Sequence, residues 1–96
     1  MTKCLGLELA PYGVRCNVVH PGVTETPAAK ANWDAGRGSR STHIAGDLAG
    51  FRAPIPLGKV GTPRDAAATV LFLLSDQAGH ITMEDIVVDG GATMIA

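Results

Sequence analysis

The single tyrosine of this chain lacks the neighbouring cation that would let it act as a base. Tyr12 is the only tyrosine, and Cys16 stands one helical turn after it. A phenol with an unperturbed pKa of about 10 needs a neighbouring cation to act as a base at neutral pH. The sequence supplies no such pair, so we expect no catalytic residue in this chain.

The histidines and cysteines do not form a metal-ligand pattern. His20, His43 and His80 are far apart in the sequence, and Cys4 and Cys16 match neither a zinc motif nor a disulfide framework. We therefore expect no metal site. We interpret both cysteines as small buried apolar residues of a cytosolic protein.

Two strand endings are the most informative features of the sequence. Residues 17–26 read NVVHPGVTET, a valine-rich strand that runs into a Pro-Gly turn and a polar loop. Residues 86–91 read IVVDGG, a second strand closed by two glycines. Ligands of open α/β sheets bind beyond the carboxyl ends of such strands. These endings are the first place to look for a binding site.

The elements that position these endings follow from hydrophobic periodicity. Met1–Ala10 has helical spacing and is followed by Gly13, which suits a left-handed helix end. Val14–Val19 is predicted to be a parallel strand, although Arg15 and Asn17 interrupt it and need polar partners or a place near the rim. The apolar run Ala66–Leu74 is predicted to be one helix, and the chain begins without an N-cap, as if inside a longer helix.

That apolar helix has the clearest start signal in the sequence. Thr62 is a good N-cap, Pro63 fits the first helical position, and Asp65 stands where a capping-box acid reaches back. Because Ala66–Leu74 is apolar nearly all round, we expect burial on more than one side, by a sheet and by another helix or subunit.

The predicted fold class is α/β: the C-terminal part of a Rossmann-like doubly wound parallel sheet, lacking the N-terminal nucleotide-binding half. Two parallel strands are marginal in water and need cover on both faces. We therefore expect residues 1–96 to be a fragment of a single domain. A homo-oligomer through the helix Ala66–Leu74 and the last strand is also expected.

Residues 27–56 lack a clear period and are predicted to form a mobile lid over a substrate. Segments of this length are uncommon inside a compact domain and are usually functional. Ala28–Trp33 is predicted to be a short helix, and Gly36–Ser41 is predicted to be flexible. Trp33, Arg37 and Arg40 are the candidate substrate residues, because an arginine could pair with a substrate carboxylate. Solvated arginines are the alternative.

Composition excludes several partner classes. The net charge is −1, and no run approaches the roughly 20 apolar residues of a membrane span. The first residues lack the basic region of a secretion signal. Nucleic acid and membranes are therefore not expected partners, and a cytoplasmic location is expected.

Several motifs in order resemble the C-terminal third of the short-chain dehydrogenase/reductase family. They are residues 17–22 with Thr26, residues 55–58, residues 71–76 (LFLLSD) and residues 87–91. Residues 80–91 (HITMEDIVVDGG), together with residues 3–10 and 14–19, are similar to the 2,3-dihydro-2,3-dihydroxybenzoate dehydrogenase branch. That resemblance implies NAD as cofactor, a small cyclic alcohol as substrate and a role in catecholate siderophore synthesis.

The resemblance also assigns residues. It implies that backbone groups of Pro21, Gly22, Val23 and Thr24 bind the nicotinamide carboxamide, and that the side chain of Thr26 meets the adjacent phosphate or nicotinamide. His20 is either a structural residue or a neighbour of the nicotinamide. Asp89-Gly90-Gly91 is expected to be a structural turn near a subunit contact.

The family's glycine-rich turn and Tyr-x-x-x-Lys pair have no counterpart here, so we expect the isolated chain to be inactive. The sequence leaves three interpretations open: an NAD-dependent enzyme piece from a truncated gene or a misplaced start codon, the same piece of another member such as a 3-oxoacyl carrier protein reductase, or a non-catalytic fragment that docks on full-length relatives. The DNA upstream of Met1 would discriminate among them.

Overall fold

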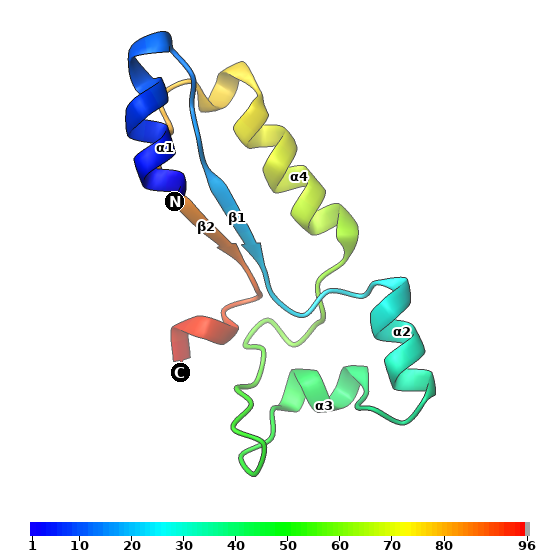
Figure 1. The fold of residues 1–96 in the computed structure, drawn as a ribbon. Helices are drawn as coiled ribbons and strands as arrows, with labels where there is room; N and C mark the ends of the chain where they lie inside the picture. The colour runs from blue at the N-terminus through cyan, green and yellow to red at the C-terminus, as the bar shows by residue number, and fades with distance from the viewer. Residues whose placement is uncertain (96) are drawn as a thin grey trace.

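A computed structural model describes residues 1–95 of the chain, an α/β arrangement of two strands and four α-helices with short 3₁₀ turns (Figure 1). In chain order the elements are α1 (Thr2–Leu9), η1 (Ala10–Tyr12), β1 (Val18–Pro21), α2 (Pro27–Asp34), α3 (Arg40–Ala45), α4 (Pro63–Leu74), η2 (Asp76–Ala78), β2 (Asp85–Val88) and η3 (Ala92–Ile95). No helix among the described residues has the length and apolarity needed to cross a membrane.

The two strands are parallel, as predicted. Val18 pairs with Asp85 and Pro21 pairs with Val88, so both strands end at the same edge of the sheet. In Figure 1, α1 and α4 lie on either side of this pair, while α2 and α3 lie beyond the ends of the strands. The sheet therefore directs both strand endings toward the α2–α3 segment.

β1 starts later and ends later than the predicted strand Val14–Val19. The polar residues before it are held by side-chain contacts. Arg15 donates from Nη1 to the Leu73 carbonyl at 2.7 Å and from Nη2 to the Ser75 carbonyl at 3.2 Å, so it caps the end of α4. The Cys16 amide donates to the Thr82 hydroxyl at 3.1 Å. The expectation of polar partners for Arg15 is confirmed, and these partners explain why the ladder begins only at Val18.

Both helix-end predictions are confirmed. Gly13 has φ of 72° and closes η1, the extra turn that follows α1. At α4, the Thr62 amide donates to Asp65 Oδ2 at 2.8 Å, and the Asp65 amide donates to the Thr62 hydroxyl at 3.3 Å. The Thr62 hydroxyl also donates to Asp65 Oδ2 at 3.0 Å. The hydrogen bonds that the Thr62 amide and hydroxyl donate to this carboxylate lower the pKa of Asp65.

The helix Ala66–Leu74 is mostly exposed in this chain, as expected for a fragment that lacks the partners needed to bury it. Only Leu73 on α4 is buried, while Leu71 and Leu74 are 67% and 74% exposed. The expectation that both cysteines are buried is wrong, since Cys4 is exposed and Cys16 is only half-buried. Two strands and the helices beside them do not supply enough surface to close a core.

The dimensions of the molecule show the same incompleteness. The radius of gyration is 16.2 Å, whereas a compact domain of this length has about 12.5 Å. The accessible surface is 6828 Å², against about 5,200 Å² for a folded monomer of this mass. The excess is about 1,600 Å², and exposed apolar side chains such as Leu71 and Leu74 contribute to it.

One groove lies along the edge of β1 that does not pair with β2. It has a volume of about 640 Å³ and is lined by Leu5 of α1, by Val18 and Val19 of β1, and by Val70 and Leu74 of α4. Among the described residues, no second strand pairs with this edge. Its apolar walls and open strand edge suit a further parallel strand with its covering helix.

The segment 27–56 contains two helices. α2 confirms the predicted short helix, and its bounds extend the prediction by one residue at each end. α3 was not predicted. It starts inside the stretch predicted to be flexible, because the Ser39 hydroxyl accepts a hydrogen bond from the Thr42 amide at 3.2 Å and so forms an N-cap.

Candidate functional site

The candidate cofactor turn, residues 21–26, leaves the end of β1 beside the end of β2. The Gly22 amide donates to the Val88 carbonyl at 2.9 Å. A Cβ on Gly22 would lie 2.7 Å from Asp89 Cβ and 2.9 Å from Asp89 Cα, so a larger residue would push the two strand endings apart. Glycine is needed here for close approach of the strand endings.

A short bridge to Gly61 fixes the shape of the cofactor turn. The Glu25 amide donates to the Gly61 carbonyl at 2.7 Å, and the Gly61 amide donates to the Val23 carbonyl at 3.0 Å. The Thr24 hydroxyl donates to the Gly22 carbonyl at 3.0 Å. Within residues 1–95, the backbone N–H groups of Val23 and Thr24 make no hydrogen bond. The turn is held from one side and leaves two donors available to a ligand.

Thr26 has a local role that the sequence interpretation missed. Its hydroxyl oxygen accepts a hydrogen bond from the Ala29 amide at 3.1 Å, which makes Thr26 the N-cap of α2. The signal was present, because Thr26-Pro27 repeats the Thr-Pro pattern that starts α4 at Thr62-Pro63. The hydroxyl hydrogen can still donate to a ligand.

Residues 27–56, the predicted lid, bring together two of the three predicted substrate residues. The guanidinium carbon of Arg40 lies 5.5 Å from the centroid of the Trp33 ring. Arg40 Nη2 also donates to Glu25 Oε1, an ion pair between α3 and the cofactor turn. Arg37 is turned elsewhere, because its Nε donates to Asn32 Oδ1 at 3.1 Å. No pattern in the sequence pointed to Glu25.

His43 also contacts the Trp33 ring. Its ring centroid is 5.9 Å from that of Trp33, and Arg52 Nη1 lies 2.8 Å from His43 Nδ1. Burial and the nearby Arg52 charge lower the pKa of His43. A neutral imidazole can accept the Arg52 hydrogen bond, whereas a protonated one cannot.

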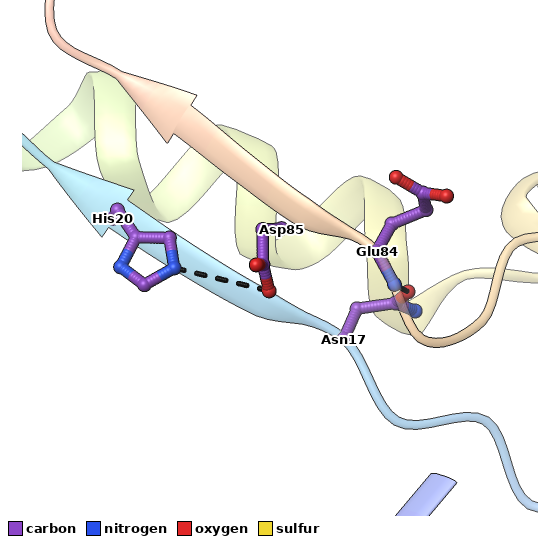
Figure 2. A network of polar contacts seen from close by, with 4 residues as sticks. All are labelled: Asn17, His20, Glu84 and Asp85. Atoms are coloured by element: carbon purple, nitrogen blue, oxygen red, sulfur yellow. Dashed lines mark hydrogen bonds and ion pairs between the residues drawn. The ribbon is translucent and has the colours of Figure 1, made fainter. Parts of the chain in front are cut away.

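The polar residues along the strands connect the strand pair (Figure 2). The Glu84 amide donates to Asn17 Oδ1 at 3.1 Å, and His20 Nε2 lies 3.9 Å from Asp85 Oδ1. His20 therefore faces the neighbouring strand in this structure. Among the described residues, no group of three histidine, cysteine or acidic side chains is placed to hold a metal ion.

The Asp89 turn is held by its own side chain. Its carboxylate accepts from the Gly91 amide at 2.9 Å, the Thr93 amide at 2.8 Å and the Thr93 hydroxyl at 2.7 Å. These hydrogen bonds, led by the Thr93 hydroxyl, lower the pKa of Asp89. The geometry supports the expected structural role of this turn.

Tyr12 lies away from the cofactor turn. It belongs to η1, which precedes β1, while the turn follows β1, and its side chain is 79% exposed. The strand separates the phenol from the candidate site.

Comparison with known proteins resolves the family. The family model described as enoyl-(acyl carrier protein) reductase matches residues 1–93. The chain belongs to the short-chain dehydrogenase/reductase family. A vibriobactin-specific 2,3-dihydro-2,3-dihydroxybenzoate dehydrogenase of Vibrio cholerae is 55% identical over 94 residues, which is 98% of this chain and 36% of the relative. A 2,3-dihydro-2,3-dihydroxybenzoate dehydrogenase of Bacillus subtilis is 54% identical, over 97% of this chain and 35% of the relative.

Solved structures of the family show the same arrangement. A short-chain oxidoreductase of Pseudomonas aeruginosa with bound NADPH superimposes with a TM-score of 0.76 at 31% identity, over 94% of this chain and 33% of that one. The chain thus spans about a third of the length of the short-chain dehydrogenase/reductases it matches. This confirms the predicted fold class and the resemblance to one segment of the Rossmann-like domain.

Proposed function

We propose that this chain is the C-terminal third of an NAD-dependent 2,3-dihydro-2,3-dihydroxybenzoate dehydrogenase of catecholate siderophore synthesis. In this proposal the cofactor turn, residues 21–26, forms the nicotinamide edge of the site. The observation that carries it is the pair of unpartnered N–H groups on Val23 and Thr24, at the carboxyl ends of two adjacent parallel strands. This is where dinucleotides bind in such sheets.

The residues of the cofactor turn have separate roles in this proposal. Pro21 and Gly22 bring the turn against the end of β2, and Val23 and Thr24 offer their N–H groups to the carboxamide. The hydroxyl of Thr26 donates its hydrogen to a cofactor oxygen while its oxygen caps α2. Such fixed donors orient the nicotinamide ring without rearrangement of the protein. Orientation of this kind lowers the barrier to hydride transfer.

The reaction in this proposal removes a hydride from a ring carbinol carbon and a proton from its hydroxyl. The bound nicotinamide would take the hydride, and the enone that remains tautomerises to an aromatic catechol. The proton must pass to a base, and Tyr12 stands at the opposite end of β1 from the turn. In this proposal a part of the protein outside these 96 residues supplies the base, and we expect no turnover from the chain alone.

The substrate side of the proposal uses the lid, residues 27–56. Trp33 and Arg40 contact one another and reach the cofactor turn through Glu25. Arg37 is placed outside this pair, since its guanidinium contacts Asn32. A planar guanidinium beside an aromatic ring suits a ring that carries a carboxylate.

The remaining parts of the proposal concern the surroundings of the chain. The exposed apolar face of α4, with β2, is proposed to pack against another subunit of a homo-oligomer, in the cytoplasm. The second candidate, a fragment that docks on full-length relatives without catalysis, is supported by the same apolar surface. The groove along β1 supports either occupant, an N-terminal half in the same chain or in another one.

A chimera tests the proposed function. Residues 1–96 would replace the corresponding third of the Vibrio cholerae relative, to which they are 55% identical. We expect the chimera to reduce NAD⁺ with 2,3-dihydro-2,3-dihydroxybenzoate, to prefer NAD⁺ over NADP⁺, and to form a catechol product. A folded chimera that binds NAD⁺ but oxidises only 3-hydroxyacyl thioesters would assign the chain to another branch. A folded chimera that binds no nicotinamide cofactor would refute the site.

A further inference from the structure

Glu25 and Arg40 join two parts of the site that are separate in the sequence. Glu25 lies within the cofactor turn, between Thr24 and Thr26, and Arg40 is the first residue of α3 in the lid. The side chains are 25% and 54% exposed, so Glu25 is largely covered while Arg40 remains accessible to solvent. This ion pair is a direct side-chain link between the turn and α3.

Trp33 keeps Arg40 in place and leaves part of its guanidinium available. The guanidinium lies against the indole ring, and His43 contacts the same indole. Arg40 donates only to Glu25 among the described residues, although a guanidinium has five N–H groups. A second carboxylate can therefore approach the same guanidinium, in the paired geometry that arginine favours.

We propose that the Glu25–Arg40 ion pair is a latch that the substrate opens, because the substrate carboxylate competes with Glu25 for Arg40. This inference rests on the proposed function and adds Glu25 as a competitor of the substrate carboxylate within the protein. With the site empty, Glu25 holds α3 to the cofactor turn. When the substrate enters, the Arg40 guanidinium releases the Glu25 carboxylate and binds the substrate carboxylate. The lid then contacts the substrate through Arg40, and the charge of Arg40 stays neutralised.

Competition predicts effects of opposite sign for the two partners. Replacing Glu25 by glutamine removes the competitor and makes Arg40 available in every molecule. For an exposed ion pair this tightens carboxylate binding about two- to sixfold. Replacing Arg40 by glutamine removes the receptor and weakens binding about ten- to a hundredfold. A merely structural ion pair would shift both variants in the same direction.

The test uses the chimera described above and its variants Glu25→Gln, Arg40→Gln and Arg40→Lys. We expect KM for the carboxylated diol to fall in the first variant and to rise in the second, with Arg40→Lys between wild type and Arg40→Gln. KM for the same cyclic diol without the carboxylate should stay within about twofold in all of them. Lys30→Gln, an exposed cation of α2 in the same lid, is the matched control and should leave both KM values unchanged.

Calorimetric binding of 2,3-dihydroxybenzoate gives a readout that needs no turnover. Opposite shifts of its Kd in Glu25→Gln and Arg40→Gln would support the latch even if the chimera did not oxidise the diol, which would refute only the proposed function. Normal turnover with weaker binding in both variants, or with no change in either, would overturn the latch and leave the proposed function standing. Retained NAD⁺ binding and melting temperature would show that each variant is folded.

Discussion

Replacing Thr26 by valine removes one hydroxyl with two partners, and the structure shows only one of them. The oxygen accepts from the Ala29 amide at 3.1 Å and caps α2, while the hydrogen is available to the cofactor. Loss of such a cap costs about 1 kcal/mol, within a range of roughly 0.5–2. A domain of 150–250 residues then melts about 2–4 °C lower for each kcal/mol.

The cofactor part of the effect is separate. A hydrogen bond from this hydroxyl to a charged cofactor oxygen contributes roughly 1.5–3 kcal/mol, so Thr26→Val should weaken NAD⁺ binding about ten- to a hundredfold. The assay is NAD⁺ titration of the chimera, with thermal melting of the cofactor-free protein. Thr26→Ser keeps both hydrogen bonds and should leave the Kd and the melting temperature nearly unchanged.

The matched control is Thr62→Val. Thr62 caps α4 with the same Thr-Pro pattern and donates its hydroxyl hydrogen to Asp65 rather than to a ligand. Its replacement should lower the melting temperature and leave the Kd for NAD⁺ as it is. If Thr26→Val lowers the melting temperature while the Kd stays constant, Thr26 is only a helix cap, and its assignment as a cofactor residue is wrong.

Three further predictions remain, two for the isolated 96-residue chain and one for the folded chimera. The isolated chain should produce no NADH absorbance with excess NAD⁺ and dihydrodiol, because Tyr12 has no neighbouring cation and lies away from the cofactor turn. Turnover above a blank would contradict this. The isolated chain should be self-associated or poorly folded, because Leu71 and Leu74 are exposed; a monodisperse monomer with a cooperative melt above about 50 °C would count against it. The lowered pKa of His43 means that the unfolded chain binds the proton more readily. The stability from neutral His43 is therefore complete above about pH 6.5 and is lost as pH falls through the lower folded pKa. In the folded chimera, the urea midpoint should be lower at pH 5 than at pH 7.5, and an equal loss in His43→Gln would refute the assignment to His43.

The sequence by itself determined the elements whose causes lie within a few residues. The cap of α4 follows from Thr62 and Asp65, which are three positions apart, and the end of η1 follows from Gly13. The motifs around residues 17–26 and 80–91 identified the family, because they are continuous in the chain. The deficit of the core was also predictable, since two parallel strands cannot cover an apolar helix on every side.

Only the tertiary structure decided which distant groups meet. Arg15 reaches the last carbonyls of α4, 58 residues away, and so delays the start of β1. Gly22 must be a glycine because Asp89 lies against it, and Arg40 meets Glu25 because α2 and α3 fold back toward the cofactor turn. No local pattern encodes these contacts. They depend on the path of the chain between the strand endings. Packing determines this path, whereas helical or strand periodicity does not.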